Sequence, residues 1–143
     1  QDGYHIRLNK CKAAYVYGDK EKIKQVLSNF VSNAIKYCGD DRVVIVEVKR
    51  IGKKVRVDVI DHGDGIASDE LSHVWERYYR TSANRNRSIE GSGLGLSIVK
   101  GILVLHNANY GVKSKVGQGS DFWFEMDTVK KPTDTESKNK THG

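Results

Sequence analysis

Apolar residues recur at three- and four-residue steps between Asp19 and Cys38, a pattern that predicts an amphipathic helix with one buried face. Asp19 is expected to cap the start of this helix, because an aspartate side chain accepts hydrogen bonds from backbone N–H groups that have no partner inside the helix. The apolar positions are Ile23, Val26, Leu27, Phe30, Val31, Ala34 and Cys38.

A polar stripe lies on one flank of the same predicted helix. It consists of Gln25, Asn29, Asn33 and Lys36, with Tyr37 beside them. Amide oxygens suit a hard cation such as Mg²⁺, and a neighbouring lysine can meet the phosphates that such an ion bridges. Taken alone, the stripe is more typical of a solvated helix face, so the interpretation as a site depends on the other motifs of the chain.

Strands are predicted on both sides of this helix, because apolar and polar residues alternate there. A hairpin with one buried face turns at Gly52, and a second helix runs from Leu94 to the region of His106. Ser68 is expected to cap a short helix between them. The predicted strands are residues 4–8, 14–17, 43–49, 55–59, 110–116 and 121–126. Together these elements favour an α/β fold, a two-layer sandwich with a mixed sheet covered on one face by helices.

Length and composition bound the organisation of the chain. With 143 residues and 38% hydrophobic content, the chain is long enough for one core and too short for two domains of ordinary size. One domain is therefore predicted for residues 1–127. A disordered tail is predicted for residues 128–143, which carry the sole proline and almost no apolar side chains.

Charge, cysteine usage and hydropathy exclude several classes of function. The net charge of +6 is scattered along the chain without a nucleic-acid motif, so no nucleic-acid partner is expected. No run of 18 apolar residues and no signal-peptide core occur, so no membrane contact is expected of this part of the chain. Cys11 and Cys38 have no metal-binding spacing, and buried free thiols in the cytoplasm are the simplest interpretation.

Three glycines at alternate positions, Gly91, Gly93 and Gly95, precede the second helix. Glycine-rich loops before helices often bind phosphate, because bare backbone N–H groups and the helix N-terminus attract anions. The lysine and serine or threonine of a P-loop are absent, and Leu96 stands where the third glycine of the dinucleotide fingerprint belongs. These two familiar phosphate loops are excluded.

Four motifs follow one another in a fixed order. They are Asn29-x-x-x-Asn33-Ala34-x-Lys36-Tyr37, Asp61-x-Gly63-x-Gly65, Trp75-x-Arg77-Tyr78-Tyr79-Arg80 and Gly91-x-Gly93-Leu94-Gly95-Leu96. In this order they resemble the N box, first glycine box, F box and second glycine box of the ATP-binding catalytic domain of bacterial sensor histidine kinases. The resemblance covers residues 4–127 and implies the Bergerat ATP-binding fold, which gyrase, a chaperone ATPase family and mismatch-repair ATPases share.

The resemblance implies that ATP and Mg²⁺ are the cofactors. Asp61 would accept a hydrogen bond from the adenine amino group, and Gly63 and Gly65 would let the backbone approach the base. Tyr37 would lie along the nucleotide.

The phosphate end of the implied site uses other residues. Asn33, with Asn29, would hold Mg²⁺, while Lys36 and Arg80 would meet phosphate charge, and residues 81–90 would form a mobile ATP lid. The catalytic set is then Asn29, Lys36 and Arg80. The second glycine box supplies the remaining nucleotide-binding positions, which are Gly91, Gly93, Leu94, Gly95 and Leu96.

The chain departs from the family pattern at two places. Trp75 and Tyr78 stand where the F box usually has phenylalanine, which leaves the packing of the aromatic wedge open. The His-Gly-Gly that often follows the second helix is replaced by His106 and two residues without glycine, so Asn107 or Asn109 must make the turn.

Residue 29 bears on the reaction. Hydrolytic relatives carry a glutamate at this position as general base, whereas Asn29 cannot usefully accept a proton. A neutral histidine is already a nucleophile, so the sequence favours transfer of the γ-phosphate to histidine. A nucleotide-binding regulatory module without kinase activity and a hydrolytic ATPase remain the alternatives.

None of the five histidines opens the His-Glu/Asp-x-x-Pro type of motif that the family phosphorylates, and His62 is interpreted as a loop side chain near the pocket. The resemblance therefore implies an acceptor histidine on a separate dimerisation domain of a homodimeric protein. It further implies a response regulator as partner and the cytoplasmic part of a membrane-anchored sensor as location.

Overall fold

The computed structural model of the chain describes residues 5–10, 15–76 and 95–130. Several sequence-based expectations lie outside these residues. They are Cys11, Tyr78, Arg80, Gly91, Gly93, Leu94, the lid of residues 81–90 and the tail beyond residue 130.

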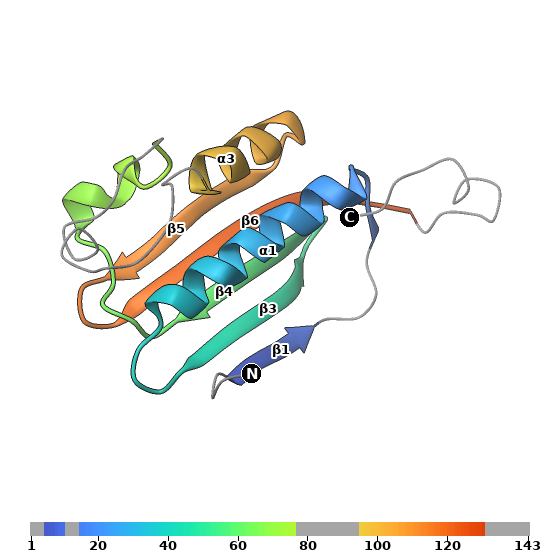
Figure 1. The fold of residues 1–143 in the computed structure, drawn as a ribbon. Coiled ribbons are helices and arrows are strands. Elements are labelled where there is room, and N and C mark those ends of the chain that lie inside the picture. The colour runs from blue at the N-terminus through green and yellow to red at the C-terminus, as the bar shows by residue number, and fades with distance from the viewer. Residues whose placement is uncertain (1–4, 11–14, 77–94, 131–143) are drawn as a thin grey trace.

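Within the described residues, six strands form one mixed sheet (Figure 1). The strand order is β1-β3-β4-β6, and both β5 and β2 pair with β6. β1 runs parallel to β3, and the other pairs are antiparallel. The strands are β1 His5–Lys10, β2 Tyr15–Val16, β3 Val43–Ile51, β4 Lys54–Asp61, β5 Asn109–Lys115 and β6 Gly119–Val129. Both predicted hairpins are confirmed, and β6 extends two residues past the boundary expected at Asp127.

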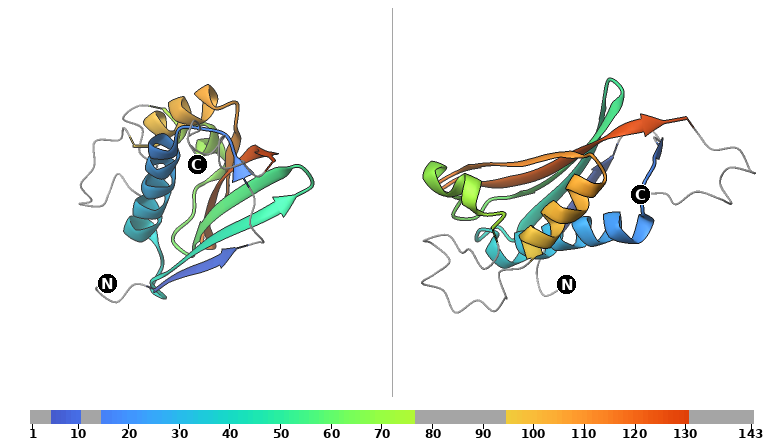
Figure 2. Two further views of the ribbon diagram at one scale, coloured as in Figure 1. Left: turned by 90° about the vertical axis from the view of Figure 1, so that its right-hand side faces the viewer. Right: turned by 90° about the horizontal axis from the view of Figure 1, so that it is seen from above.

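Two α-helices, α1 (Lys20–Tyr37) and α3 (Gly95–Leu105), cover one face of the sheet, as the two turned views of Figure 2 show. The two-layer α/β architecture expected from the sequence is therefore confirmed. No helix of the described segments combines the length and the hydropathy that a membrane crossing requires.

The first helix begins at the predicted cap. Asp19 Oδ1 accepts hydrogen bonds from the backbone N–H groups of Glu21 and Lys22 at 3.0 and 3.2 Å. The predicted apolar face packs on the sheet, and its buried members are Ile23, Val26, Phe30 and Ala34. This buried face, more than intrinsic helix propensity, stabilises a helix in a domain of this kind.

Trp75 shows how the altered F box packs. Its ring lies edge-on to Phe30 at 6.3 Å, to Phe122 at 5.7 Å and to Tyr110 at 5.0 Å between centroids. Edge-to-face pairs of this kind add about 0.5–1.5 kcal/mol beyond the buried area. Tryptophan therefore fills the aromatic position between helix α1 and the sheet.

Asn107 makes the turn after α3. Its φ angle is 54°, and asparagine tolerates this left-handed conformation better than most residues. The N–H of Ala108 donates to the Leu103 carbonyl at 3.0 Å and that of Asn107 to the Val104 carbonyl at 3.1 Å. These are the two bonds of a Schellman cap. Of the two asparagines that the sequence left open, Asn107 is the one that replaces glycine.

The expectation that Ser68 caps a helix is wrong. Residues Ser68–His73 form the 3-10 helix η1, and the cap position belongs to Ala67, which makes no side-chain cap bond. Ser68 already lies inside the first turn, so its hydroxyl is not placed to receive the free N–H groups.

The face of the sheet opposite the helices is called the outer face below. Side chains also cover part of this face, although the alternation of residues in the first hairpin predicts only one buried face. Asp58 is only 4% exposed and accepts from Arg56 Nε at 2.7 Å. Arg56 also donates to Glu125 at 3.3 Å, and its guanidinium lies 4.2 Å from the ring centroid of Trp123. Long side chains of the sheet itself thus shield a carboxylate on a face without helices.

Candidate functional site

The candidate site begins where β4 ends, at Asp61. This residue is 4% exposed, and its Oδ1 accepts the Gly63 N–H at 2.8 Å, across the intervening His62. Burial raises the pKa of the Asp61 carboxyl, and the hydrogen bond from Gly63 opposes that rise. A buried carboxylate at the end of a strand is a hydrogen-bond acceptor that is already desolvated and oriented.

The loop of residues 61–65, called the reading loop below, fits against the end of α1. A Cβ added to Gly63 would overlap the carbonyl oxygen of Tyr37. A Cβ added to Gly39 would likewise overlap the carbonyl oxygen of His62. Any larger residue at Gly63 or Gly39 would therefore collide with main chain, which cannot rotate away as a side chain can. The glycines here are required by backbone-to-backbone contact.

The other side of the reading loop fits against the turn between β5 and β6. Gly119 and Gly65 have φ angles of 105° and 76°, and a Cβ on either would overlap main chain, at Asp61 and at Lys115 respectively. The N–H of Gly117 donates to the Asp64 carbonyl at 2.8 Å. The loop is thus enclosed between α1 and the β5–β6 turn.

Ser114 continues this link beyond the loop. Its hydroxyl accepts the Ile66 N–H at 2.7 Å and lies 2.8 Å from both the Gly119 carbonyl and the Ser120 hydroxyl. One hydroxyl therefore joins the exit of the reading loop to the start of β6.

The polar stripe of α1 leads away from this loop. Tyr37 contacts Gly63 through its carbonyl, while Asn33 and Asn29 lie one and two turns earlier on the helix. Asn29 and Asn33 are half-buried and Lys36 is exposed, so these three residues lie outside the core. The structure brings Tyr37, Asp61, Gly63 and Gly65 together and places the two asparagines along the same helix.

The donor set suits a hard cation. The side-chain oxygens of Asn29 and Asn33 are the type of ligand that Mg²⁺ accepts. In the described part of the chain, no cluster of three His, Cys, Asp or Glu side chains could hold a metal. In general, Mg²⁺ keeps several water ligands and is bound by few protein side chains together with phosphate oxygens.

The second glycine box is described only from Gly95 onward. Gly95 opens α3 in an exposed position, and a Cβ there would meet no atom within 4 Å. Leu96 is half-buried and packs against the hydrophobic core. In the structure, Leu96 therefore contacts the core near the start of α3.

Three contributors to the site gave no signal in the sequence. Gly39 and Gly119 touch the reading loop from opposite sides, and Asp41 Oδ2 lies 2.6 Å from His62 Nδ1. A glycine near a helix end or in a hairpin is typical of a turn, so its contact with a distant loop could not be separated from that ordinary role.

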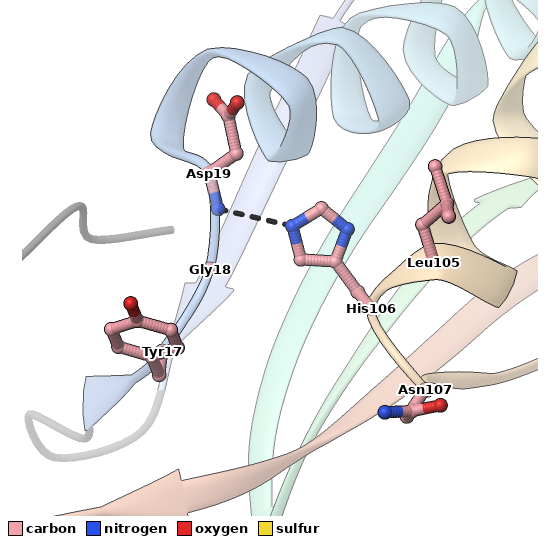
Figure 3. Close-up of a pocket in the computed structure, with 6 residues that line it drawn as sticks. All are labelled: Tyr17, Gly18, Asp19, Leu105, His106 and Asn107. Atoms are coloured by element: carbon pink, nitrogen blue, oxygen red, sulfur yellow. Dashed lines mark hydrogen bonds between the residues drawn. The ribbon is translucent and has the colours of Figure 1, made fainter.

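A cavity of about 440 Å³ lies at the opposite end of α1 (Figure 3). It is formed by the start of α1 and the end of α3, far along the helix from the Tyr37 end. It is therefore distinct from the candidate site. Its lining residues are Tyr17, Gly18, Asp19, Leu105, His106 and Asn107.

Comparison with known proteins places this geometry in a family. Residues 18–130 match the family described as Histidine kinase-, DNA gyrase B-, and HSP90-like ATPase. The sensor-like histidine kinase SenX3 of Mycobacterium tuberculosis is 40% identical over 107 residues, which cover 75% of this chain and 26% of the relative. The chain thus spans about a quarter of the length of such relatives.

Solved structures show the same fold. Full-length ShkA in complex with AMPPNP superposes with a TM-score of 0.76 at 28% identity, over 92% of this chain and 27% of that one. The mycobacterial sensor histidine kinase MprB gives a TM-score of 0.80 at 24% identity, over 91% of this chain and 87% of that one.

Proposed function

The chain belongs to the family of histidine kinase-, DNA gyrase B- and HSP90-like ATPases, and from this membership we propose that it is the ATP-binding catalytic domain of a two-component sensor histidine kinase. Its reaction is transfer of the γ-phosphate of ATP to a histidine on a separate dimerisation domain. The relative SenX3 carries the name of a sensor-like histidine kinase, and ShkA is described in complex with an ATP analogue.

The observation that carries the proposal is the buried carboxylate of Asp61. A carboxylate accepts hydrogen bonds and cannot donate them while ionised, so it distinguishes an amino group from a carbonyl on a purine ring. Gly63 and Gly65 let the reading loop lie directly against main chain at Tyr37 and Lys115, and this packing holds the loop in place beside the base. Asp61 then selects adenine through its amino group, and Tyr37 lies along the nucleotide.

The phosphates extend from the base along the polar stripe of α1. Asn33 and Asn29 would hold Mg²⁺, and Lys36 would offset the charge of the phosphates. The ion supplies charge neutralisation between the phosphates. In the second glycine box, Gly95 brings the start of α3 to the phosphate end.

Asn29 favours histidine as the acceptor over water. An amide cannot remove a proton from water at neutral pH, whereas the neutral imidazole of an acceptor histidine needs no general base. The domain then acts by positioning the γ-phosphate and neutralising its charge. A hydrolytic ATPase would need a base that the polar stripe does not supply.

The partners follow from this reaction. We infer a dimerisation domain that carries the acceptor histidine, in a homodimeric protein, and a response regulator that receives the phosphate afterwards. The domain works on the cytoplasmic side of a membrane-anchored sensor. SenX3, with about four times the length of the matched segment, has room for such additional domains.

The test is calorimetric titration with Mg-ATP, together with transfer of labelled phosphate to an added dimerisation domain. Asp61→Asn should weaken ATP binding by about 1–3 kcal/mol, because the amide can oppose the adenine amino group with a donor of its own. Asp64→Asn, an exposed position of the same loop, is the matched control and should bind as the wild type does. Equal affinities for wild type and Asp61→Asn would overturn the site.

A further inference from the structure

Asp41 and His62 form a contact beside the reading loop. His62 Nδ1 lies 2.6 Å from Asp41 Oδ2, and the ring nitrogen is the donor because an ionised carboxylate only accepts. Asp41 belongs to the turn between α1 and β3, and His62 lies 21 positions later, between Asp61 and Gly63. The pair therefore connects the turn after the phosphate-facing helix to the loop that faces the base.

The Asp41 carboxylate is fixed before it meets the histidine. Its other oxygen, Oδ1, accepts the Val43 N–H at 3.0 Å, so both oxygens are engaged. The turn that carries it is held by the bond from Arg42 N–H to the Gly39 carbonyl at 3.0 Å. Arg42 has a φ angle of 54°, a conformation that few non-glycine residues adopt. These bonds hold the Asp41 carboxylate in one position relative to the turn that carries it.

His62 is the residue through which Asp41 reaches Asp61. The hydrogen bond from Gly63 N–H to Asp61 Oδ1 spans His62, so the backbone angles of His62 determine whether that bond forms. The His62 carbonyl is pressed against Gly39, which fixes the main chain on one side. The bond to Asp41 fixes the side chain, and the two restraints together set the orientation of the Asp61 carboxylate.

We propose that the Asp41–His62 contact is a latch that positions Asp61 to discriminate adenine from purines without the amino group. The proposal rests on the nucleotide site proposed above and deepens it. His62 acts through Asp61 and is a positioning residue, not a catalytic one.

The latch has little effect on folding. The side chains of His62 and Asp41 are 46% and 43% exposed, and pairs with such exposure contribute little to stability. Loss of the latch should therefore leave the thermal midpoint nearly unchanged. It should reduce the preference for ATP over the purine without the amino group by about two- to five-fold. This fold-change corresponds to the interaction energy of one exposed ion pair.

The experiment compares the affinity for Mg-ATP with that for purine riboside triphosphate, which lacks the 6-amino group. Wild type should prefer ATP at least about five-fold, the lower limit for one lost buried hydrogen bond. Asp41→Ala and His62→Gln should reduce that ratio. His62→Asn should keep it, because the asparagine amide nitrogen is as many bonds from Cα as Nδ1, whereas the glutamine nitrogen is one bond further.

His73→Gln is the matched control. His73 lies 2.8 Å from Glu76 in a pair with 48% and 58% exposure, similar to the latch but outside the reading loop. It should leave the ratio unchanged. The latch is overturned if His62→Asn and His62→Gln behave alike, or if the variants weaken both nucleotides equally. A wild type without preference for ATP would instead overturn the proposed role of Asp61, and the latch with it.

Discussion

The imidazole of His106 accepts the backbone N–H of Asp19 at Nε2, over 3.0 Å (Figure 3). Its other nitrogen, Nδ1, lies 2.8 Å from the Ile102 carbonyl and carries the ring proton, because Nε2 is occupied as an acceptor. A side chain just beyond α3 thereby binds the backbone of the residue that caps α1. Helices α1 and α3 are thus joined at the end of α1 opposite the reading loop.

Gly18→Ala should destabilise the protein through this contact. A Cβ at residue 18 would lie 2.8 Å from His106 Cδ2, and the ring cannot move away without losing its bond to Asp19. We expect the free energy of unfolding to fall by about 1–3 kcal/mol, the usual effect of overpacking. Urea denaturation at constant pH measures it.

The control for this prediction is the same substitution in a His106→Ala background. Without the ring, the nearest atom that Gly18→Ala would meet in the described part of the chain is the flexible end of the Met126 side chain, 3.5 Å from the added Cβ. The double variant should therefore lose less free energy of unfolding than the sum of the losses in the two single variants. Strictly additive losses would mean that the ring does not hold its place.

ATP affinity should fall as the pH falls through the raised pKa of Asp61. Burial raises this pKa, so protonation occurs at a higher pH than for an ordinary aspartate. The protonated carboxyl becomes a donor and opposes the adenine amino group. Affinity should then decrease by up to about ten-fold for each pH unit below the pKa of the free protein. Titration calorimetry over a pH series measures this slope.

Asp61→Asn supplies the baseline for that series. The nucleotide phosphates also titrate in weakly acidic solution, and this contribution is common to both proteins. The difference between wild type and variant isolates the carboxyl. If both lose affinity in parallel, Asp61 does not contact the base.

Asp121 should make stability depend on pH. It lies on the outer face, where its Oδ1 is buried and has no hydrogen-bond partner among the residues that the structure describes. Burial and then the negative charge of Asp58 raise the pKa of Asp121 to about 6. The folded protein thus holds this proton more tightly than the unfolded chain. The resulting stabilisation is present below the ordinary value of 3.8 and is lost as the pH rises through about 6.

Asp121→Asn should raise the free energy of unfolding at pH 7 by about 1–2 kcal/mol, with allowance for solvent screening, and should flatten its change between pH 4 and 7. The amide keeps the shape of the protonated carboxyl without its ionisation. Asp69→Asn, at an exposed position of η1, is the control and should retain the wild-type pH profile. A wild-type profile for Asp121→Asn would contradict the assignment.

Asn29→Glu should increase ATP hydrolysis. The wild type is expected to release phosphate very slowly, because residue 29 cannot act as a base toward water. General-base catalysis contributes about 10²- to 10⁴-fold, so even a poorly placed carboxylate should give a measurable increase. The added charge should also disturb Mg²⁺ and reduce transfer to an added dimerisation domain. Steady-state phosphate release and phosphotransfer are measured side by side.

Gln25→Glu is the matched control for Asn29→Glu. It places the same charge on the same stripe, four residues and about 6 Å further along the helix from the reading loop. Phosphate release should stay at the wild-type rate. Rapid release by the wild type itself, without phosphorylation of the added histidine, would identify a hydrolytic ATPase.

The elements with a strong period could be predicted from the sequence. Helix α1 and both hairpins follow from apolar spacing, since burial of one face imposes that spacing whatever the rest of the chain does. The proximity of Asp61, Gly63 and Gly65 could be predicted because they form a local motif, whereas their role in nucleotide binding stays a prediction. For the turn after α3, the sequence leaves two candidates, Asn107 and Asn109, because only a residue that tolerates positive φ fits there.

The remaining features depend on contacts between distant segments. The buried state of Asp58 follows from the cover that Arg56 of the same strand and Trp123 of the neighbouring strand β6 provide, while alternation alone assigns Asp58 to the solvent side. The role of Asp41 depends on a loop 21 positions away. Ser68 was misassigned because its residue type suits a cap, although the chain enters the short helix one residue earlier.

The enclosure of the reading loop by main chain has a consequence for inhibitor resistance. At Gly39, Gly63 and Gly119 a single added methyl group would collide with a carbonyl, so these positions offer no viable substitutions by which a cell could escape a compound. A compound that bonds to the backbone of this loop would contact atoms that mutation cannot remove. Resistance would have to arise from side chains outside the reading loop. An inhibitor scaffold could therefore bind the backbone of the loop, while its variable groups contact other parts of the site.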